Sequence, residues 1–268
     1  MKTLPLHVVT QGDEGRPAIV FLHGFLGSSR DWQSLTGQFA PDYFTLCPDL
    51  PGHGQSVGLR YPEDYTMEGA AGQVRQILDA HGIGSCLLVG YSMGGRLALH
   101  LAAHHAARFH GALVESARPG LAAPEEQDQR VSQDEIRAAE IESGDFAAFL
   151  DRWYRQPLFE TLAQQPGRIE ALIKSRSGNA PSELARSLRA MGAGRQASLW
   201  PELPALTVPI LAVAGADDRK FAPIAQQMAG LSPSVEAAIV ADAGHNVHLE
   251  QPEDFARVLE GFARRVLT

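Results

Sequence analysis

The residue pattern with the clearest chemical meaning is a serine between two glycines, Gly90-x-Ser92-x-Gly94. An apolar run, 85–91, leads into it, and a helix-compatible stretch, 94–105, follows it. A serine on such a strand-to-helix turn is held exposed in a strained conformation, and the flanking glycines leave room for the neighbouring strand and helix. The helix N-terminus places free backbone N–H groups beside the serine oxygen. The pattern favours a nucleophile elbow over a glycine-rich turn that a serine merely caps.

A reactive serine needs a base and an acid, and two later strand ends supply candidates for both. The apolar run ending at Gly215 is followed by Asp217 and Asp218, and the last apolar run is followed by His245. The carboxyl ends of parallel strands form one sheet edge, where ligands bind, so we expect these side chains near Ser92. His245 would accept a proton while a carboxylate orients its ring. Asp218 is preferred over Asp217, because the Gly215-x-x-Asp218 turn is the usual spacing for the acid in hydrolase folds.

Ten histidines are present, and most have a plain structural interpretation. His248 is the nearest rival of His245 as the base. His23, which follows the first clear apolar run, is expected to shape its loop through a structural hydrogen bond. In the same loop the backbone N–H of Phe25 would face the serine and form an oxyanion hole with the N–H of Met93. Solvated or capping positions suffice for His100, His104, His105 and His110.

Short apolar runs alternate with helical patterns along the chain, which is typical of a parallel sheet covered on both faces. The expected strands are 18–22, 43–47, 85–91, 112–115, 210–215 and 235–240. The expected helices between them are 67–80, 94–105, 223–229 and 252–266, with Pro223 and Pro252 in first turns. The fold class is therefore α/β, with a mostly parallel central sheet and helices on both faces.

The segment 118–200 interrupts this alternation. It has no convincing strand pattern and carries charged helical patterns at 124–142 and 145–154. Such a length is far beyond an ordinary connection, so we expect a helical cap inserted over the carboxyl edge of the sheet. The predicted organisation is a core made of 1–117 and 201–268, with 118–200 as the cap.

Several motifs together resemble the α/β-hydrolase superfamily across nearly the whole chain. They are Leu22-His-Gly-Phe25, Asp49-Leu-Pro-Gly-His-Gly54, Gly90-Tyr-Ser-Met-Gly-Gly-Arg96, the Gly215–Asp218 turn and Gly244-His245. A narrower set is similar to the 2-succinyl-6-hydroxy-2,4-cyclohexadiene-1-carboxylate synthases of menaquinone (vitamin K2) biosynthesis. That set adds Glu115-x-x-x-Pro-Gly-Leu121, Trp153-Tyr-Arg-Gln-Pro157, Ser175-Arg-Ser177 and Asp218-Arg-Lys-Phe221.

The narrower resemblance implies a lyase on a hydrolase scaffold, which eliminates pyruvate from 2-succinyl-5-enolpyruvyl-6-hydroxy-3-cyclohexene-1-carboxylate. A proton would leave the carbon beside the succinyl ketone, and the N–H groups of Phe25 and Met93 would hold the enolate charge. No cofactor and no metal is implied. Ser92 could act as the base, relayed by His245, or as a covalent nucleophile, and residue types leave this open. The alternatives are a carboxylesterase or carbon–carbon bond hydrolase acting on a small acidic substrate, and a non-catalytic ligand sensor.

The implied substrate carries three carboxylates, which call for fixed cationic donors. Arg96 lies one helical turn after the serine, where a buried arginine either forms a salt bridge or faces a ligand. Arg130 and Arg176 match carboxylate-binding positions of the family, although each would otherwise be an exposed cap charge. The family also places an aromatic pair, here Trp153 and Tyr154, near the substrate; core packing is the alternative. Tyr91 completes the set as an expected pocket wall.

Composition limits the partners. With 31 acidic and 23 basic residues the net charge is −8, which argues against nucleic acid and anionic membrane surfaces. Only three of the 23 basic residues are lysines, so arginine, suited to bidentate carboxylate recognition, dominates. Two cysteines are too few for a disulfide framework, and residues 1–15 lack a signal-peptide pattern, which favours a reduced cytoplasmic setting. We expect a monomer or small homo-oligomer acting on a small-molecule tricarboxylate.

Overall fold

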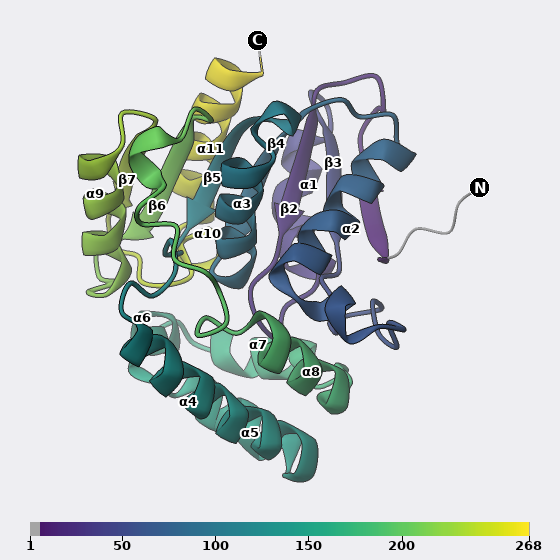
Figure 1. Ribbon diagram of the computed structural model, residues 1–268, viewed down its shortest axis with the longest axis vertical. Coiled ribbons are helices and arrows are strands. Elements are labelled where there is room, and N and C mark those ends of the chain that lie inside the picture. The colour runs from purple at the N-terminus through teal and green to yellow at the C-terminus, as the bar shows by residue number, and fades with distance from the viewer. Residues whose placement is uncertain (1–5, 268) are drawn as a thin grey trace.

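A seven-stranded sheet forms the centre of the computed structural model, which describes residues 6–267 (Figure 1). The strand order is β1-β3-β2-β4-β5-β6-β7, and only β1 runs antiparallel to its neighbour. The strands are β1 (Val8–Gln11), β2 (Ala18–Leu22), β3 (Phe44–Pro48), β4 (Cys86–Tyr91), β5 (Phe109–Glu115), β6 (Ile210–Gly215) and β7 (Val235–Val240). Residues 1–5 and 268 lie outside the described residues. They include the start of the N-terminal stretch 1–15 and the two outer ends of the expected core.

All the strands expected from the sequence are present, and the fold class is confirmed. β2, β6 and β7 have the expected bounds, β3 is displaced by one residue, and β4 starts one residue late. β5 starts three residues early, at Phe109, because its first residues pair with the adjacent β4. β1, a short edge strand that exists through its ladder with β3, was not expected from the sequence. Its pattern has no buried face that would mark it as a strand.

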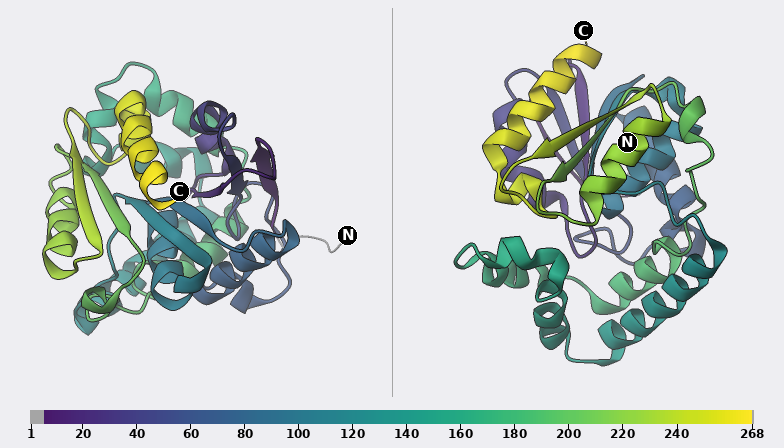
Figure 2. Two further views of the ribbon diagram at one scale, coloured as in Figure 1. Left: turned by 90° about the horizontal axis from the view of Figure 1, so that it is seen from above. Right: turned by 90° about the vertical axis from the view of Figure 1, so that its left-hand side faces the viewer.

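Helices cover both faces of the sheet, as the buried strand patterns predict (Figures 1 and 2). On one face lie α2 (Met67–Ala80), α3 (Met93–His104) and α9 (Phe221–Leu231), and on the other lie α1 (Gln33–Phe39) and α11 (Pro252–Val266). Neighbouring strand residues alternate between the two layers: Val20 packs with the first group of helices and Phe21 with the second. This double coverage explains why the parallel strands are continuously apolar.

Four of these helices were expected at nearly these positions. α2 and α11 have the expected bounds, α3 starts and ends one residue earlier, and α9 extends two residues beyond the expected range at each end. The sequence analysis missed α1 and the short α10 (Val247–Glu250). Both are short, so their apolar spacing gives little periodicity, and packing against the sheet is what stabilises them.

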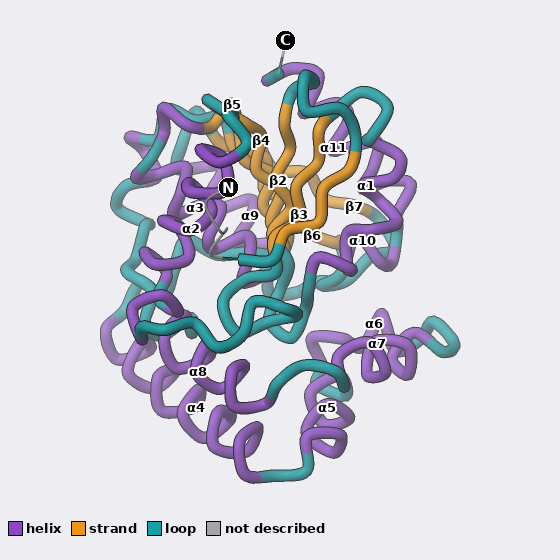
Figure 3. Tube along the Cα trace, turned by 90° about the vertical axis from the view of Figure 1, so that its right-hand side faces the viewer, coloured by secondary structure: helices purple, strands orange, loops and turns teal. Residues whose placement is uncertain are grey.

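The chain between β5 and β6 folds into helices only. They are α4 (Pro124–Ser143), α5 (Phe146–Tyr154), α6 (Glu160–Ala163), α7 (Arg168–Arg176) and α8 (Pro181–Met191), joined by turns and short 3₁₀ segments. This helical layer lies at one end of the sheet (Figures 1 and 3). Its apolar side chains form a separate cluster around Phe149, Leu150 and Leu188, which Leu26 from a loop of the sheet layer joins. That arrangement supports the proposed cap at 118–200 and the core at 1–117 and 201–268.

The α11 face provides a test of how the sheet is stabilised. Phe255 is fully buried between α11 and the sheet, whereas Ile136 on α4 is 63% exposed. We expect Phe255→Ala to lower the free energy of unfolding by about 3–5 kcal/mol, because it leaves a cavity. Ile136→Ala, the control, should change it by less than about 0.5 kcal/mol. Urea denaturation followed by circular dichroism measures both, and equal effects would contradict this packing assignment.

Candidate active site

Ser92 occupies the turn between β4 and α3, with φ 49° and ψ −102°. Its backbone N–H donates to the carbonyl of Glu115 at 2.9 Å, which ties the turn to β5. A Cβ at Gly90 would collide with the Gly94 carbonyl, and one at Gly94 would collide with the carbonyl of Leu22. The positive φ of a non-glycine residue is strained, and it is held here by backbone packed closely on both sides. The local geometry is that of the expected nucleophile elbow.

His245 and Asp218 form a buried pair. The His245 Nδ1 lies 2.9 Å from Oδ2 of Asp218, and the other carboxylate oxygen accepts the N–H groups of Lys220 and Phe221 at 3.1 and 3.0 Å. Burial raises the pKa of Asp218, but its hydrogen bond to His245 and these amides outweigh burial and lower the pKa overall. Asp218 is therefore held as a carboxylate, and Nε2 of His245 makes no hydrogen bond to another described residue.

Glu250 holds the backbone on both sides of His245. Its Oε2 accepts the N–H of Gly244 at 2.9 Å, and its Oε1 accepts the N–H of Asn246 at 3.0 Å. The Glu250 side chain is buried, so these two charge-assisted bonds satisfy it. The sequence analysis missed this role. The spacing Gly244-His245-x-x-x-x-Glu250 is a local signal, but many glutamates lie five residues after a histidine.

The two rival residues have other surroundings. Asp217 is exposed, and its side chain makes no hydrogen bond or ion pair within the described residues. His248 is buried and pairs with Glu115, whose Oε2 lies 2.8 Å from its Nδ1. Its ring packs 4.6 Å from that of Trp32. The geometry thus supports Asp218 and His245 for the acid and base roles.

The loop after β2 contributes Phe25, whose backbone amide is free within the described part of the chain, to the wall of the cavity that Ser92 lines. Across residues 6–267, neither the Phe25 nor the Met93 backbone N–H donates a hydrogen bond to another protein group. His23 shapes this loop, as expected: its Nδ1 lies 2.8 Å from the Gly24 carbonyl, and its Nε2 accepts the N–H of Leu50 at 2.8 Å. Burial lowers the pKa of His23, which suits a neutral ring that donates at one nitrogen and accepts at the other.

The serine cavity, of about 120 Å³, lies where these groups meet. Ser92, Met93, His245 and Phe25 line it from the sheet layer, and Trp153 and Leu188 line it from the helical layer. An outer cavity of about 430 Å³ shares Trp153 and His245 with it and reaches Asp218. The helical layer therefore covers the reactive groups, and a substrate would be bound between the two layers.

Arg96 is buried in the wall of the serine cavity. Its Nη1 donates to Oε1 of Gln196 and its Nη2 to the carbonyl of Met191, both at 3.0 Å. Burial, together with the charge of Arg130, lowers the pKa of Arg96 to about 10. No carboxylate among the described residues pairs with it, so the salt-bridge alternative does not apply.

Arg130 and Trp153, two of the expected substrate residues, line both the serine cavity and the outer cavity. Nε of Arg130 donates to Oδ1 of Asp134 at 2.8 Å, and the same oxygen accepts from Arg137 at 3.0 Å. Arg130 thus has one internal partner and keeps part of its guanidinium toward the cavity. The Trp153 ring packs edge-on against the ring of Phe25, at 5.5 Å between centroids.

Three expected substrate residues lie outside both cavities. Arg176 forms a bidentate ion pair with Asp31, with Nη2 2.8 Å from Oδ2, and its Nε lies 3.3 Å from the Tyr154 hydroxyl. Tyr91 packs against the imidazole of His245, at 5.3 Å between ring centroids. The expected free carboxylate clamp at Arg176 is not what the structure shows, because a buried guanidinium has found a carboxylate within the protein.

The sequence analysis missed two cationic residues of the serine cavity, Arg118 and Lys220. Lys220 lies in the Asp218-Arg-Lys-Phe221 motif that carried part of the resemblance, so a signal for it was available. Arg118 is the first residue of the 118–200 segment, and no motif in the sequence marks it as a site residue. Its position beyond β5, between the elbow strand and the strand of Asp218, becomes apparent only from the sheet order.

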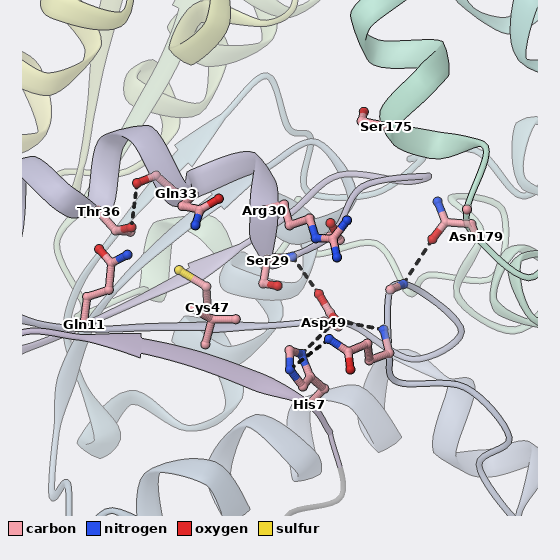
Figure 4. A pocket seen from close by; sticks show the side chains of 15 residues that line it. His7, Gln11, Ser29, Arg30, Gln33, Thr36, Cys47, Asp49, Ser175 and Asn179 are labelled. Carbon is pink, nitrogen blue, oxygen red and sulfur yellow. Dashed lines mark hydrogen bonds and ion pairs between the residues drawn. The ribbon is translucent and has the colours of Figure 1, made fainter.

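A third cavity, of about 280 Å³, lies away from the catalytic pair, between β1, the loop after β2 and the end of α7 (Figure 4). Asp49 organises its wall: Oδ1 accepts the N–H of Ser29 at 2.7 Å, and Oδ2 accepts that of Gln55 at 2.8 Å. His7 contacts the same carboxylate at 3.0 Å. These bonds satisfy Asp49 internally, which accounts for the Asp49-Leu-Pro-Gly-His-Gly54 motif as a structural loop.

Two further features concern metals and membranes. No cluster of three or more potential metal-ligating side chains occurs within residues 6–267. No helix in the part of the chain that the structure describes has the length and apolar content of a membrane span.

The fold and the arrangement of the serine, histidine and aspartate define an α/β-hydrolase-fold protein, and the sequence model of the "alpha/beta hydrolase fold" family matches residues 17–252. Curated relatives allow a narrower assignment. The 2-succinyl-6-hydroxy-2,4-cyclohexadiene-1-carboxylate synthase of Serratia proteamaculans is 37% identical, over 97% of this chain and 98% of its own. That of Citrobacter koseri is 36% identical, over 90% and 91%. The chain belongs to this synthase family.

Solved structures agree with this assignment. The structure of MenH from S. aureus superposes with a TM-score of 0.92 at 30% identity, covering 98% of this chain and 99% of that one. An enol-lactonase from Burkholderia xenovorans has a TM-score of 0.80 at 24% identity, covering 97% and 96%. The second likeness shows the fold alone.

The two buried imidazole–carboxylate pairs give a prediction that does not depend on turnover. Each should produce a strongly downfield Nδ1–H signal in the proton NMR spectrum, because both hydrogen bonds are charge-assisted and shielded from water. Asp218→Asn should abolish the signal of His245, and Glu115→Gln that of His248. Asp217→Asn should leave both signals in place. Loss of the His245 signal in the Asp217 variant would transfer the acid role to Asp217.

The Arg176–Asp31 pair can be compared with the exposed pair Arg155–Asp151. Arg176→Ala leaves Asp31 as an unpaired carboxylate with a side chain only 12% exposed, so we expect unfolding to become easier by about 3–5 kcal/mol. Arg155→Ala should leave the denaturation midpoint unchanged, because water solvates both partners. Urea denaturation at pH 7 measures the difference. Similar midpoints for the two variants would show that the buried pair does not form in solution.

Proposed function

We propose that this protein is a carbon–oxygen lyase that eliminates pyruvate from 2-succinyl-5-enolpyruvyl-6-hydroxy-3-cyclohexene-1-carboxylate and yields 2-succinyl-6-hydroxy-2,4-cyclohexadiene-1-carboxylate. Membership of the synthase family, at 37% identity over nearly the whole chain, supports the reaction class. The serine cavity supports the substrate class. It takes a small molecule, and the residues proposed to act on that molecule come from both layers of the fold.

The single observation that carries the proposal is the state of Arg96. It lies one helical turn after Ser92, is buried in the cavity wall and is bound only by neutral groups. A buried, unpaired guanidinium beside the reactive serine costs stability unless a ligand compensates its charge. A substrate carboxylate supplies that charge, whereas a neutral ester does not. Arg96 therefore favours an anionic substrate over the carboxylesterase alternative.

The elimination is then a proton transfer followed by loss of a leaving group. The C–H bond beside the succinyl ketone breaks, and its electron pair becomes the enolate. The amides of Phe25 and Met93 hold the enolate oxygen. The ketone re-forms as a double bond forms between ring carbons 2 and 3, the existing double bond moves from carbons 3 and 4 to carbons 4 and 5, and the C–O bond at carbon 5 breaks. The released enolpyruvate gains a proton to become pyruvate. His245, oriented by Asp218, holds the abstracted proton. We assign the base role to Ser92 relayed by His245, because elimination offers no acyl group to transfer.

The remaining substrate contacts follow from position. Arg130 and Trp153, which line both cavities, would bind one carboxylate and the ring. Tyr91 and Tyr154 would support the site without touching the substrate: Tyr91 packs against the His245 ring, and the Tyr154 hydroxyl contacts Arg176. For Arg176 to bind a substrate carboxylate, that carboxylate must replace Asp31.

We place the reaction in the cytoplasm, on a free tricarboxylate and without a cofactor or metal, with the protein as a monomer or small homo-oligomer. Its two cysteines are unpaired and buried, as a reducing compartment allows.

A coupled assay tests the reaction. The substrate is generated enzymatically, and pyruvate is followed with lactate dehydrogenase and NADH. The wild-type protein should release pyruvate, and Ser92→Ala and His245→Ala should each reduce turnover by at least about a hundredfold. The double variant should be little worse than either single variant, since the groups act as a unit. Glu253→Ala, on the exposed side of α11, serves as the control and should match the wild type.

The same preparation separates the alternatives. Cleavage of p-nitrophenyl esters without pyruvate release would identify a hydrolase. Absence of both activities, with saturable binding of the tricarboxylate, would identify a ligand sensor.

A further inference from the structure

The wall of the serine cavity carries four cationic side chains and no acidic one. The cations are Arg96, Arg118, Arg130 and Lys220. Arg130 has an internal partner in Asp134, but within residues 6–267 none of the other three forms a salt bridge. In a protein with a net charge of −8, this local excess of positive charge is opposite to the average. A cavity of this kind is built to bind an anion of more than one charge.

Arg118 is the member of this group with the least internal support. Its Nε is buried and has no hydrogen-bond partner, and no bond of its guanidinium to another described residue is present. Burial lowers its pKa, Glu126 raises it, and Arg130 lowers it further, with a net decrease. Burial and the charges of Arg118 and Arg130 likewise lower the pKa of Lys220. The like charges therefore repel one another in the absence of an anion, and an anion between them would relieve that repulsion.

A second group beside Arg118 also lacks a partner. Ser116 is only 1% exposed and lines the same cavity, yet its hydroxyl makes no hydrogen bond. Its φ of 48° is in the left-handed region, which is costly for a non-glycine residue and often marks a functional site. Buried polar atoms in native proteins are nearly always hydrogen-bonded. Two unpaired polar side chains in one wall therefore point to a polar ligand that completes them.

The sheet order places these residues between the reactive groups. Ser116 and Arg118 follow β5, which lies between β4, the strand of Ser92, and β6, the strand that leads to Asp218 and Lys220. Arg96 projects from α3 instead, where Gln196 and Met191 hold its guanidinium. The cavity thus has cationic groups from two separate parts of the sheet layer, as well as Arg130 from the helical layer.

We propose that Arg118, with the Ser116 hydroxyl and Lys220, forms a carboxylate-binding subsite distinct from Arg96 and fixes one carboxylate of the substrate beside the catalytic serine. The identity of that substrate rests on the proposed function, but the anion-binding property of the subsite does not. The guanidinium provides two parallel donors to the carboxylate, and the hydroxyl and ammonium provide further donors.

Kinetics of pyruvate release test the subsite in the working enzyme. Arg118→Ala should raise KM at least about tenfold and change kcat less than about threefold, since the lost contact stabilises the bound substrate and the transition state alike. Arg118→Lys should lie between this variant and the wild type, because it keeps the charge without the planar fork. Arg195→Ala is the matched control: that arginine is exposed and does not line the serine cavity, and its variant should match the wild type. A KM for Arg118→Ala equal to that of Arg195→Ala would overturn the proposal.

A binding measurement without turnover keeps the subsite separate from the proposed function. Calorimetry at low ionic strength would titrate succinate into each protein, with uncharged succinamide as the reference ligand. Succinate should bind the wild type and Arg195→Ala alike, and bind Arg118→Ala at least about tenfold more weakly. If succinate binds Arg118→Ala more weakly than the wild type, and the wild type releases no pyruvate, the subsite is upheld and the lyase is refuted. Normal pyruvate release with unchanged succinate affinity would refute the subsite alone.

Thermal unfolding distinguishes a binding residue from a structural one. Arg118 is partly buried without a partner, so its removal should leave Tm unchanged or raise it. A substantial fall in Tm for both Arg118→Ala and Arg118→Lys would identify a structural arginine and overturn the proposal.

Discussion

The structure depends on one close approach of backbone, at the turn between β4 and α3. Gly90 and Gly94 carry no Cβ, so the chain can reverse within van der Waals distance of β2 and lift Ser92 out of the sheet with a positive φ. This strain persists because β2 and the end of β5 nearest the turn are buried and cannot relax. Once the turn is fixed, α3 begins at Met93, and its first amide and the buried Arg96 take up their positions relative to the serine.

The catalytic groups come from separate turns that the parallel sheet brings to one edge. Asp218 is held by backbone amides of its own turn, and the backbone beside His245 is held by Glu250. The helical layer packs the ring of Phe159 against the imidazole. It also supplies Arg130 and Trp153, which line the cavity opposite the sheet residues. A hydrolase fold can serve a lyase reaction in this way, because the sheet edge supplies Ser92, Asp218 and His245 while the helical layer adds residues that recognise the substrate.

The net charge of the protein does not describe the charge around Ser92. The chain is acidic overall, yet the cavity beside Ser92 is lined by cations that its own carboxylates leave largely uncompensated. At Arg176 the opposite holds: Asp31 neutralises a buried guanidinium and joins α7 to the loop after β2. Two buried arginines of one chain thus differ in whether the protein itself supplies the counter-charge.

The sequence alone determined the fold class, most strand and helix positions, and the elbow around Ser92, because short-range sterics and apolar periodicity encode these features. It also indicated Asp218 and His245 through their turns. The tertiary structure decided which charges meet. Asp31 and Arg176 are far apart in sequence, and Arg118 reaches the cavity only because β5 lies between β4 and β6. Such contacts depend on sheet order and helix packing, which no local pattern records, and so the expected clamp at Arg176 became an ion pair while Arg118 was missed.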